Sequence, residues 1–141
     1  MFKKILVPID LSQSDSGEAS LVKAVEMADK TGASLVLLNV VADIPNLVAD
    51  RLPTNYAEEV QQSAAKMLDE LSSKHSLKSG SYEIRTAHGQ AYDEIINAAE
   101  RAGADLIVIA SHRPDLSDYL LGSTAAKVVR HAKCSVLVVR N

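Results

Sequence analysis

The segment Ile109–Thr124 joins an apolar run to a polar loop and then to the start of a helical pattern, in the order IASHRPDLSDYLLGST. The residues of this segment that could contact an anion are Ser111, His112, Arg113, Gly122, Ser123 and Thr124. Backbone N–H groups at a helix N-terminus lack intrahelical partners and carry partial positive charge, so they attract anions. A strand end, a loop cation and a Gly-Ser-Thr helix start therefore predict a phosphate-binding loop. The alternative is an ordinary strand-to-helix connection in which Ser123 caps the helix.

The elements that must position this loop begin with four short apolar runs rich in valine, isoleucine and leucine. They are Ile5–Ile9, Leu35–Leu38 with Val40–Val41, Leu106–Ile109 and Val136–Val139. Because apolar and polar residues do not alternate in them, we predict strands buried on both faces, as in a parallel sheet. A weaker, alternating strand is expected over Ser81–Ala87, where it suits an edge of the sheet.

Helical patterns separate these runs, with apolar residues at the spacing of one helix face. The expected helices are Ser14–Lys30, Tyr56–Lys74, Ala91–Ala102 and Ser123–Ala132. In the second helix the expected core face consists of Val60, Ala64, Met67 and Leu71. Gly32 is expected to cap the end of the first helix. The order is β-α-β-α-β-α-β-α-β with right-handed crossovers, and we expect one domain over residues 1–141.

The connection Ala42–Asn55, which contains Pro45 and Pro53, is expected to be irregular. Connections of this length without secondary structure of their own are often functional.

Open α/β sheets bind ligands beyond the carboxyl ends of their strands, at the point where strand order reverses. If the first strand lies centrally beside the fourth, the crevice is bordered by Pro8–Asp10, Val40–Val41 and Ala110–Arg113. Val40 would form an apolar wall for a planar base, and Asp10 would accept hydrogen bonds from ribose hydroxyls. Arg113 would add a charge-assisted contact to phosphates. The alternatives are that Asp10 only starts the connection to the first helix and that Arg113 only pairs with nearby aspartates in solvent.

Composition excludes several classes of protein. The chain has 141 residues, of which 47% are apolar and 23% charged, as in soluble globular proteins. A formal net charge of −3 argues against a nucleic-acid partner. The single cysteine, Cys134, rules out an internal disulfide and fits a reducing compartment. No apolar run approaches the roughly 20 residues of a membrane span, and Ile5–Ile9 is too short for the apolar part of a signal peptide. We therefore expect a cytoplasmic protein with no membrane partner.

Several catalytic and metal motifs are absent from the sequence. There is no G-x-x-x-x-G-K-[ST] sequence for a P-loop and no G-x-S-x-G sequence for a hydrolase nucleophile. The four histidines lack zinc-ligand spacing, so no metal site is expected. A phospho-acceptor receiver domain needs an aspartate after the third strand, which here ends Thr86-Ala-His-Gly89. No catalytic residue is therefore expected with a defined role.

Four stretches of the chain resemble the universal stress protein family. They are Ile5–Asp10, Asp105–His112, Leu120–Ala132 and Cys134–Arg140. The string Ala-Ser-His-Arg-Pro-Asp at residues 110–115 is similar to the bacterial F/G-type subgroup, which is associated with ATP binding.

This resemblance implies an α/β fold of the adenine nucleotide alpha hydrolase-like type. It consists of an open, parallel, five-stranded sheet in the order 3-2-1-4-5, with helices on both faces. The resemblance also implies a homodimer joined through the last strand, at Val136, Leu137, Val138 and Val139. An exposed apolar edge strand invites such pairing, and a two-fold axis would make it symmetric.

The resemblance further implies a site for ATP, with or without Mg²⁺. The adenine and ribose side falls to Pro8, Ile9, Asp10 and Val40. The phosphate side falls to Ala110, Ser111, Arg113, Gly122, Ser123 and Thr124. Ile109 and His112 are expected in the same site without an assigned role. ATP-binding members carry G-x2-G-x9-G-[ST]; here Ala110 and Arg113 replace the first two glycines, and eight residues separate Arg113 from Gly122. Alanine still allows close backbone approach, and losing a loop glycine matters only where φ is positive.

Three functions follow as hypotheses. The first is a cytoplasmic, dimeric, ATP-binding sensor or regulator of the stress response. The second is slow ATP hydrolysis, which needs a base or metal ligand among Asp10, His112 and Asp115. The third is an interaction module of the same fold that binds no nucleotide.

Overall fold

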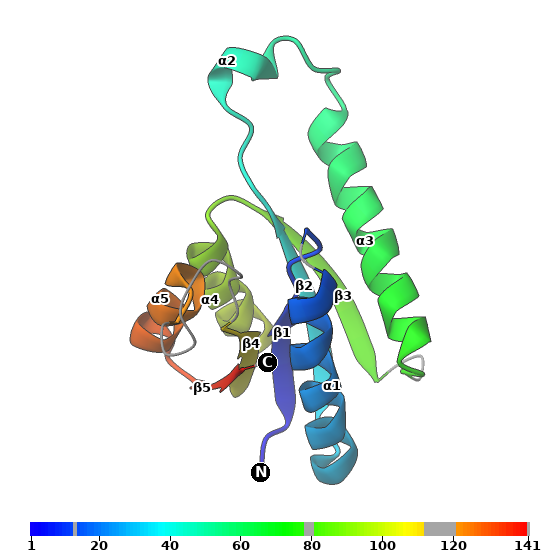
Figure 1. Ribbon diagram of the computed structural model, residues 1–141, viewed down its shortest axis with the longest axis vertical. Helices are drawn as coiled ribbons and strands as arrows, with labels where there is room; N and C mark the ends of the chain where they lie inside the picture. The colour runs from blue at the N-terminus through cyan, green and yellow to red at the C-terminus, as the bar shows by residue number, and fades with distance from the viewer. Residues whose placement is uncertain (13, 78–80, 112–120, 141) are drawn as a thin grey trace.

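The computed structural model describes residues 1–12, 14–77, 81–111 and 121–140, and at residues 14–17 it describes only the backbone. Strands follow one another along the chain with helices between them (Figure 1). The strands are β1 (Lys4–Pro8), β2 (Ser34–Val41), β3 (Tyr82–His88), β4 (Leu106–Ala110) and β5 (Ser135–Val139). The helices are α1 (Ser14–Thr31), α2 (Asn46–Ala49), α3 (Tyr56–Lys74), α4 (Ala91–Ala102) and α5 (Ser123–His131). None of the helices in these described ranges is both long and apolar enough to span a membrane.

The five strands form one parallel sheet in the order β3-β2-β1-β4-β5, which confirms the predicted fold class. Ile5 of β1 stands opposite Leu35 of β2 on one side and Leu106 of β4 on the other. Strand order therefore reverses at β1, where the crossover helices pass to opposite faces. Strand β3 occupies an edge, as its alternating sequence predicted.

The sheet separates two hydrophobic clusters, because successive side chains of a strand point to opposite faces. Val7 lies in the cluster beneath α1 and α3, together with Leu21 and Leu68. Its neighbour Leu6 lies in the cluster beneath α4 and α5, together with Val128. Figure 1 shows α1 and α4–α5 on the two sides of the strands. Helices on both faces explain why the central strands are apolar at every position.

Helix α3 has its predicted bounds, but its predicted core face is wrong at one position. Met67 is 45% exposed, whereas Leu68 is completely buried and lies between Ala64 and Ser72 on the inward face. The Ser72 hydroxyl donates a hydrogen bond to the Leu68 carbonyl oxygen at 2.8 Å. Because this bond satisfies the hydroxyl within the helix, the serine can occupy a core position. A polar residue on the buried face makes that face difficult to recognise from the sequence.

Two other helix predictions had different outcomes. Gly32 does end α1 with a left-handed φ of 76°, and its N–H donates to the Ala28 carbonyl oxygen at 2.8 Å. The connection Ala42–Asn55, in contrast, was predicted to be irregular and contains the single-turn helix α2. That turn is closed locally by N–H groups of Val48 and Ala49, which donate to the Pro45 carbonyl oxygen.

Asp105 ties the start of β4 to the start of β1. Its two carboxylate oxygens accept the backbone N–H groups of Lys3, at 2.9 Å, and Lys4, at 3.0 Å. These hydrogen bonds, that of Lys3 above all, lower the pKa of Asp105. A lowered pKa in the folded state means that the ionised carboxylate stabilises the fold.

We predict that Asp105→Asn lowers the free energy of unfolding by about 1 kcal/mol at pH 7, because the amide offers only one acceptor oxygen. The native contribution is fully present above the unfolded pKa of about 4 and is lost as pH falls through the lower folded value. Urea unfolding of both proteins from pH 7 down to acid should therefore show the two stabilities converging. A difference that stays constant with pH, or an equal loss in the exposed control Asp50→Asn, would contradict this role.

Candidate functional site

The candidate site lies where β1 and β4 end side by side in the middle of the sheet. Pro8 is the last residue of β1, and Ile9 after it is 4% exposed. Ala110 is the last residue of β4, and Ser111 after it is 6% exposed. The structure thus brings these predicted residues together at the strand-order switch point, where parallel α/β sheets bind ligands.

The exit of the chain from β1 is fixed by two hydrogen bonds at Ile9. The Ile9 N–H donates to the Leu38 carbonyl oxygen at 2.8 Å. The Ile9 carbonyl oxygen accepts from the side-chain amide of Asn39 at 2.9 Å. Asn39 is 8% exposed, so this bond is made in the protein interior and its loss would leave a buried acceptor without a partner. It therefore determines where Asp10 emerges.

Asn39 was not among the residues predicted for the site. The signal was present as a single polar residue inside the apolar run of the second strand, between Leu38 and Val40. A buried polar side chain needs a partner, and here that partner is the backbone at the site.

The side chain of Asp10 stabilises the first turn after β1. Its Oδ1 atom accepts the Ser12 N–H at 2.9 Å and the Ser12 hydroxyl at 2.6 Å. The predicted alternative role of Asp10, starting the connection to the first helix, is therefore present in the structure. Both bonds use Oδ1, so the predicted ribose contact would fall to Oδ2.

The start of α5 is held against the end of β4. The Gly122 N–H donates to the Ser111 carbonyl oxygen at 3.2 Å, and the Ser111 N–H donates to the Val139 carbonyl oxygen at 3.0 Å. Gly122 occupies the cap position and Ser123 is the first helical residue. The cap position belongs to Gly122, and no side chain of the described residues caps the helix, so the alternative in which Ser123 is the cap is wrong. Within the described part of the chain, the N–H groups of the first turn thus have no capping side chain. Ser123 and Thr124 belong to this same turn.

Two further predicted residues lie on the α4–α5 side of the sheet. Val40 is half-buried, stands opposite Ala87 of β3, and packs against the cluster beneath α4 and α5. Ile109 is 5% exposed and belongs to the same cluster, so only its backbone is placed to meet a ligand. His112, Arg113 and Asp115 lie outside the described residues, and their roles stay predictions.

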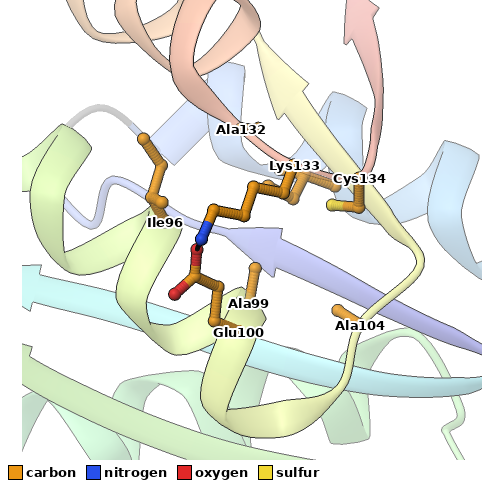
Figure 2. A pocket seen from close by; sticks show the side chains of 8 residues that line it. Ile96, Ala99, Glu100, Ala104, Ala132, Lys133 and Cys134 are labelled. Atoms are coloured by element: carbon orange, nitrogen blue, oxygen red, sulfur yellow. Dashed lines mark ion pairs between the residues drawn. The ribbon is translucent and has the colours of Figure 1, made fainter.

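A separate hollow of about 160 Å³ lies at the opposite end of the sheet, between α4 and the turns that precede β4 and β5 (Figure 2). Lys133 extends across it, and its Nζ atom pairs with Glu100 Oε1 at 3.2 Å. Burial raises the pKa of the Cys134 thiol on the wall of this hollow, so the thiol stays protonated at neutral pH. Among the residues that the structure describes, no group of three acidic, histidine or cysteine side chains could hold a metal ion.

Comparison with known proteins agrees with this geometry. The sequence profile of the universal stress protein family matches residues 1–140, so the chain belongs to the universal stress protein family. Universal stress protein G of Shigella flexneri is 32% identical over 143 residues, covering 99% of this chain and 100% of that protein. This similarity is consistent with the predicted F/G-type subgroup.

Two solved structures share the fold. Universal stress protein UspA from Lactobacillus plantarum has a TM-score of 0.80 at 26% identity, covering 98% of this chain and 97% of that one. A universal stress protein in complex with cAMP has a TM-score of 0.73 at 21% identity, covering 98% and 97% of the two chains. At the latter identity the likeness concerns the fold alone.

We predict that Asn39→Leu lowers the free energy of unfolding by about 1–2 kcal/mol, because it leaves the buried Ile9 carbonyl oxygen without its partner while changing side-chain volume little. Urea denaturation followed by circular dichroism measures the loss. The exposed Asn46 provides a matched control, and Asn46→Leu should cost less than about 0.5 kcal/mol. Equal stabilities for the Asn39 variant and the wild type would show that this bond does not hold the strand exit.

Proposed function

We propose that this protein binds ATP, with or without Mg²⁺, at the carboxyl ends of β1 and β4. We propose further that it acts as a cytoplasmic, homodimeric sensor or regulator of the stress response. The observation that carries the nucleotide proposal is the anchoring of the uncapped start of α5 beside the switch point, through the bond from Gly122 to Ser111.

The phosphate part of the proposal rests on the first turn of α5. Its backbone N–H groups are unpaired within the helix and carry the positive end of the helix dipole, which favours a phosphate. The exposed Ser123 side chain and the half-exposed Thr124 side chain add hydroxyl groups at this end of the helix. Ser111 provides the backbone link that keeps the turn at the edge of the crevice.

The adenosine part rests on the ends of β1 and β2. The apolar side chain of Val40 is half-buried at the end of β2, and Pro8 ends the neighbouring strand. Asp10 is exposed and leaves Oδ2 for ribose hydroxyls. A family member of the same fold has been solved with cAMP, which supports an adenine nucleotide as the ligand.

The hydrogen bonds of Asp10 favour a regulatory role over rapid ATP hydrolysis. Of the three residues considered for hydrolysis, it is the one that the structure describes, and its Oδ1 already accepts two hydrogen bonds from Ser12. Its other oxygen, Oδ2, is the one proposed for the ribose hydroxyls, so Asp10 cannot at the same time act as a general base at the terminal phosphate.

We predict that Ser123→Glu weakens ATP binding at least about tenfold, or by about 1.4 kcal/mol, because it places a negative charge where the phosphates bind. Glutamate near a helix N-terminus is itself favourable, so the fold should be retained. Equilibrium dialysis with ATP and Mg²⁺ measures the affinity, and mass spectrometry of denatured, freshly purified protein should detect an adenine nucleotide. Ser73→Glu, at an exposed serine of α3, is the matched control with unchanged affinity. No retained nucleotide and no binding at millimolar ATP would refute the proposal.

The dimer part of the proposal rests on the outer edge of β5. The Val139 carbonyl oxygen faces β4, where it accepts the Ser111 N–H. Since backbone groups of successive strand residues point to opposite sides, the N–H and carbonyl oxygen of Val138 face away from β4. Residues Val136–Val139 are only half-buried, so this edge offers both apolar surface and unpaired backbone groups to a second copy. Antiparallel pairing across a two-fold axis would satisfy them.

We predict that Val138→Pro gives a monomer in multi-angle light scattering, because it removes an outward N–H without affecting the bonds to β4. Val138→Lys should act in the same direction by charging the edge. Met67→Lys, at an exposed position of α3, should leave the dimer intact. A folded Val138→Pro protein that remains dimeric would place the interface elsewhere.

A further inference from the structure

All four residues of helix α2 are exposed. None of its four residues is buried, and Leu47 is 90% exposed while Val48 is 41% exposed. In Figure 1, α2 and the first turns of α3 project beyond the sheet as an arm. The first buried residue of α3 is Ala64, two turns into the helix. A single helical turn gains little stability of its own in water, so covering the exposed Leu47 and Val48 would stabilise α2.

The position of α2 along the chain indicates which surface it can reach. Strand β2 ends at Val41, directly after Val40, and α2 begins five residues later at Asn46. Five extended residues span at most about 17 Å, so the start of α2 stays within that distance of the carboxyl end of β2. This is the space in which the proposed nucleotide lies.

The base of the arm is fixed to the neighbouring strand. The Gly89 N–H donates to the Val41 carbonyl oxygen at 2.9 Å. Just beyond, the Asp43 carboxylate pairs with His88 Nδ1 at 3.0 Å. These contacts fix the point from which the arm leaves the sheet, so movement of α2 must arise between Asp43 and the packed part of α3.

The charges of the arm favour the base of the nucleotide over its phosphates. Residues 42–55 carry two carboxylates, Asp43 and Asp50, and one cation, Arg51. Because Asp43 already pairs with His88, the part of the arm beyond it holds one carboxylate, Asp50, and one cation, Arg51. It therefore has no net positive charge with which to attract a triphosphate. Its apolar side chains, Leu47 and Val48, match an uncharged aromatic ring instead.

We propose that α2 closes over the adenine base of bound nucleotide, with Leu47 and Val48 covering the face of the base that Val40 does not. This inference rests on the proposed nucleotide binding and adds a second wall to the same site. Closure removes Leu47 from water and excludes water from the base, so nucleotide binding favours the closed position of the arm. Because the arm is tethered beside the site, it competes effectively with surfaces of other molecules.

Limited trypsin digestion of the dialysed, full-length protein tests this closure at the exposed Arg51, in the arm itself. Saturating ATP should slow cleavage after Arg51 at least about fivefold. Cleavage after Lys133, in the exposed turn before β5, provides the internal control and should change little. Protection of Arg51 that depends on protein concentration rather than on ATP would identify a second copy as the occupant and overturn the proposal.

Nucleotide release provides the second measurement. Leu47→Asp should raise the dissociation rate of a fluorescent ATP analogue at least about fivefold in stopped flow, because closure would bury a charge. Met67→Asp, at a similarly apolar but distant exposed position, should leave the rate unchanged. If wild-type protein binds ATP but Arg51 stays unprotected or Leu47→Asp releases ATP at the wild-type rate, the closure is wrong and nucleotide binding stands. If equilibrium dialysis detects no ATP binding, both proposals are wrong.

Discussion

The architecture of the site depends on how β1 leaves the sheet. A central parallel strand has neighbours on both sides, and its last residues must satisfy their backbone groups before the chain turns toward a helix. Ile9 does this with the Leu38 carbonyl oxygen and the buried amide of Asn39. A buried carbonyl oxygen without a partner would be costly, so this contact fixes the direction of the exit. Asp10 is therefore presented at the switch point by the sheet rather than by the loop that follows.

On the other side of the switch point, a second chain of hydrogen bonds fixes the end of β4 and the start of α5. The Val139 carbonyl oxygen accepts from Ser111, and the Ser111 carbonyl oxygen accepts from Gly122. The last strand, the end of β4 and the start of α5 are thus one connected backbone unit. In the proposed dimer the outer side of the same β5 strand pairs with a second copy. Only Val139 and Ser111 would then separate the dimer edge at Val138 from Gly122 on the phosphate side of the proposed site. Nucleotide binding and dimer assembly would be linked through these two residues.

Much of the fold followed from the sequence because the signals were local and strong. Helices α3 and α4 begin and end where periodicity placed them, and Gly32 caps α1 as its position suggested. The strand order came from the family resemblance, since apolar runs alone do not specify which strands are neighbours.

The errors arose where tertiary contacts override the sequence pattern. Ser72 satisfies its hydroxyl inside the helix, so a polar residue marks the core face and Met67 does not. Asn39 was missed because its partner lies thirty residues away in the chain. The helix α2 was not predicted because its single turn carries no periodic signal.

The proposed ligand site lies at the carboxyl ends of the strands, away from the hollow beside Cys134. Backbone amide chemical shifts in a titration of labelled protein with ATP and Mg²⁺ test this placement most directly. We expect the largest changes on the amides of Asp10, Val40, Gly122 and Ser123. Changes centred on Ala104, Lys133 and Cys134, with none at the first group, would contradict it.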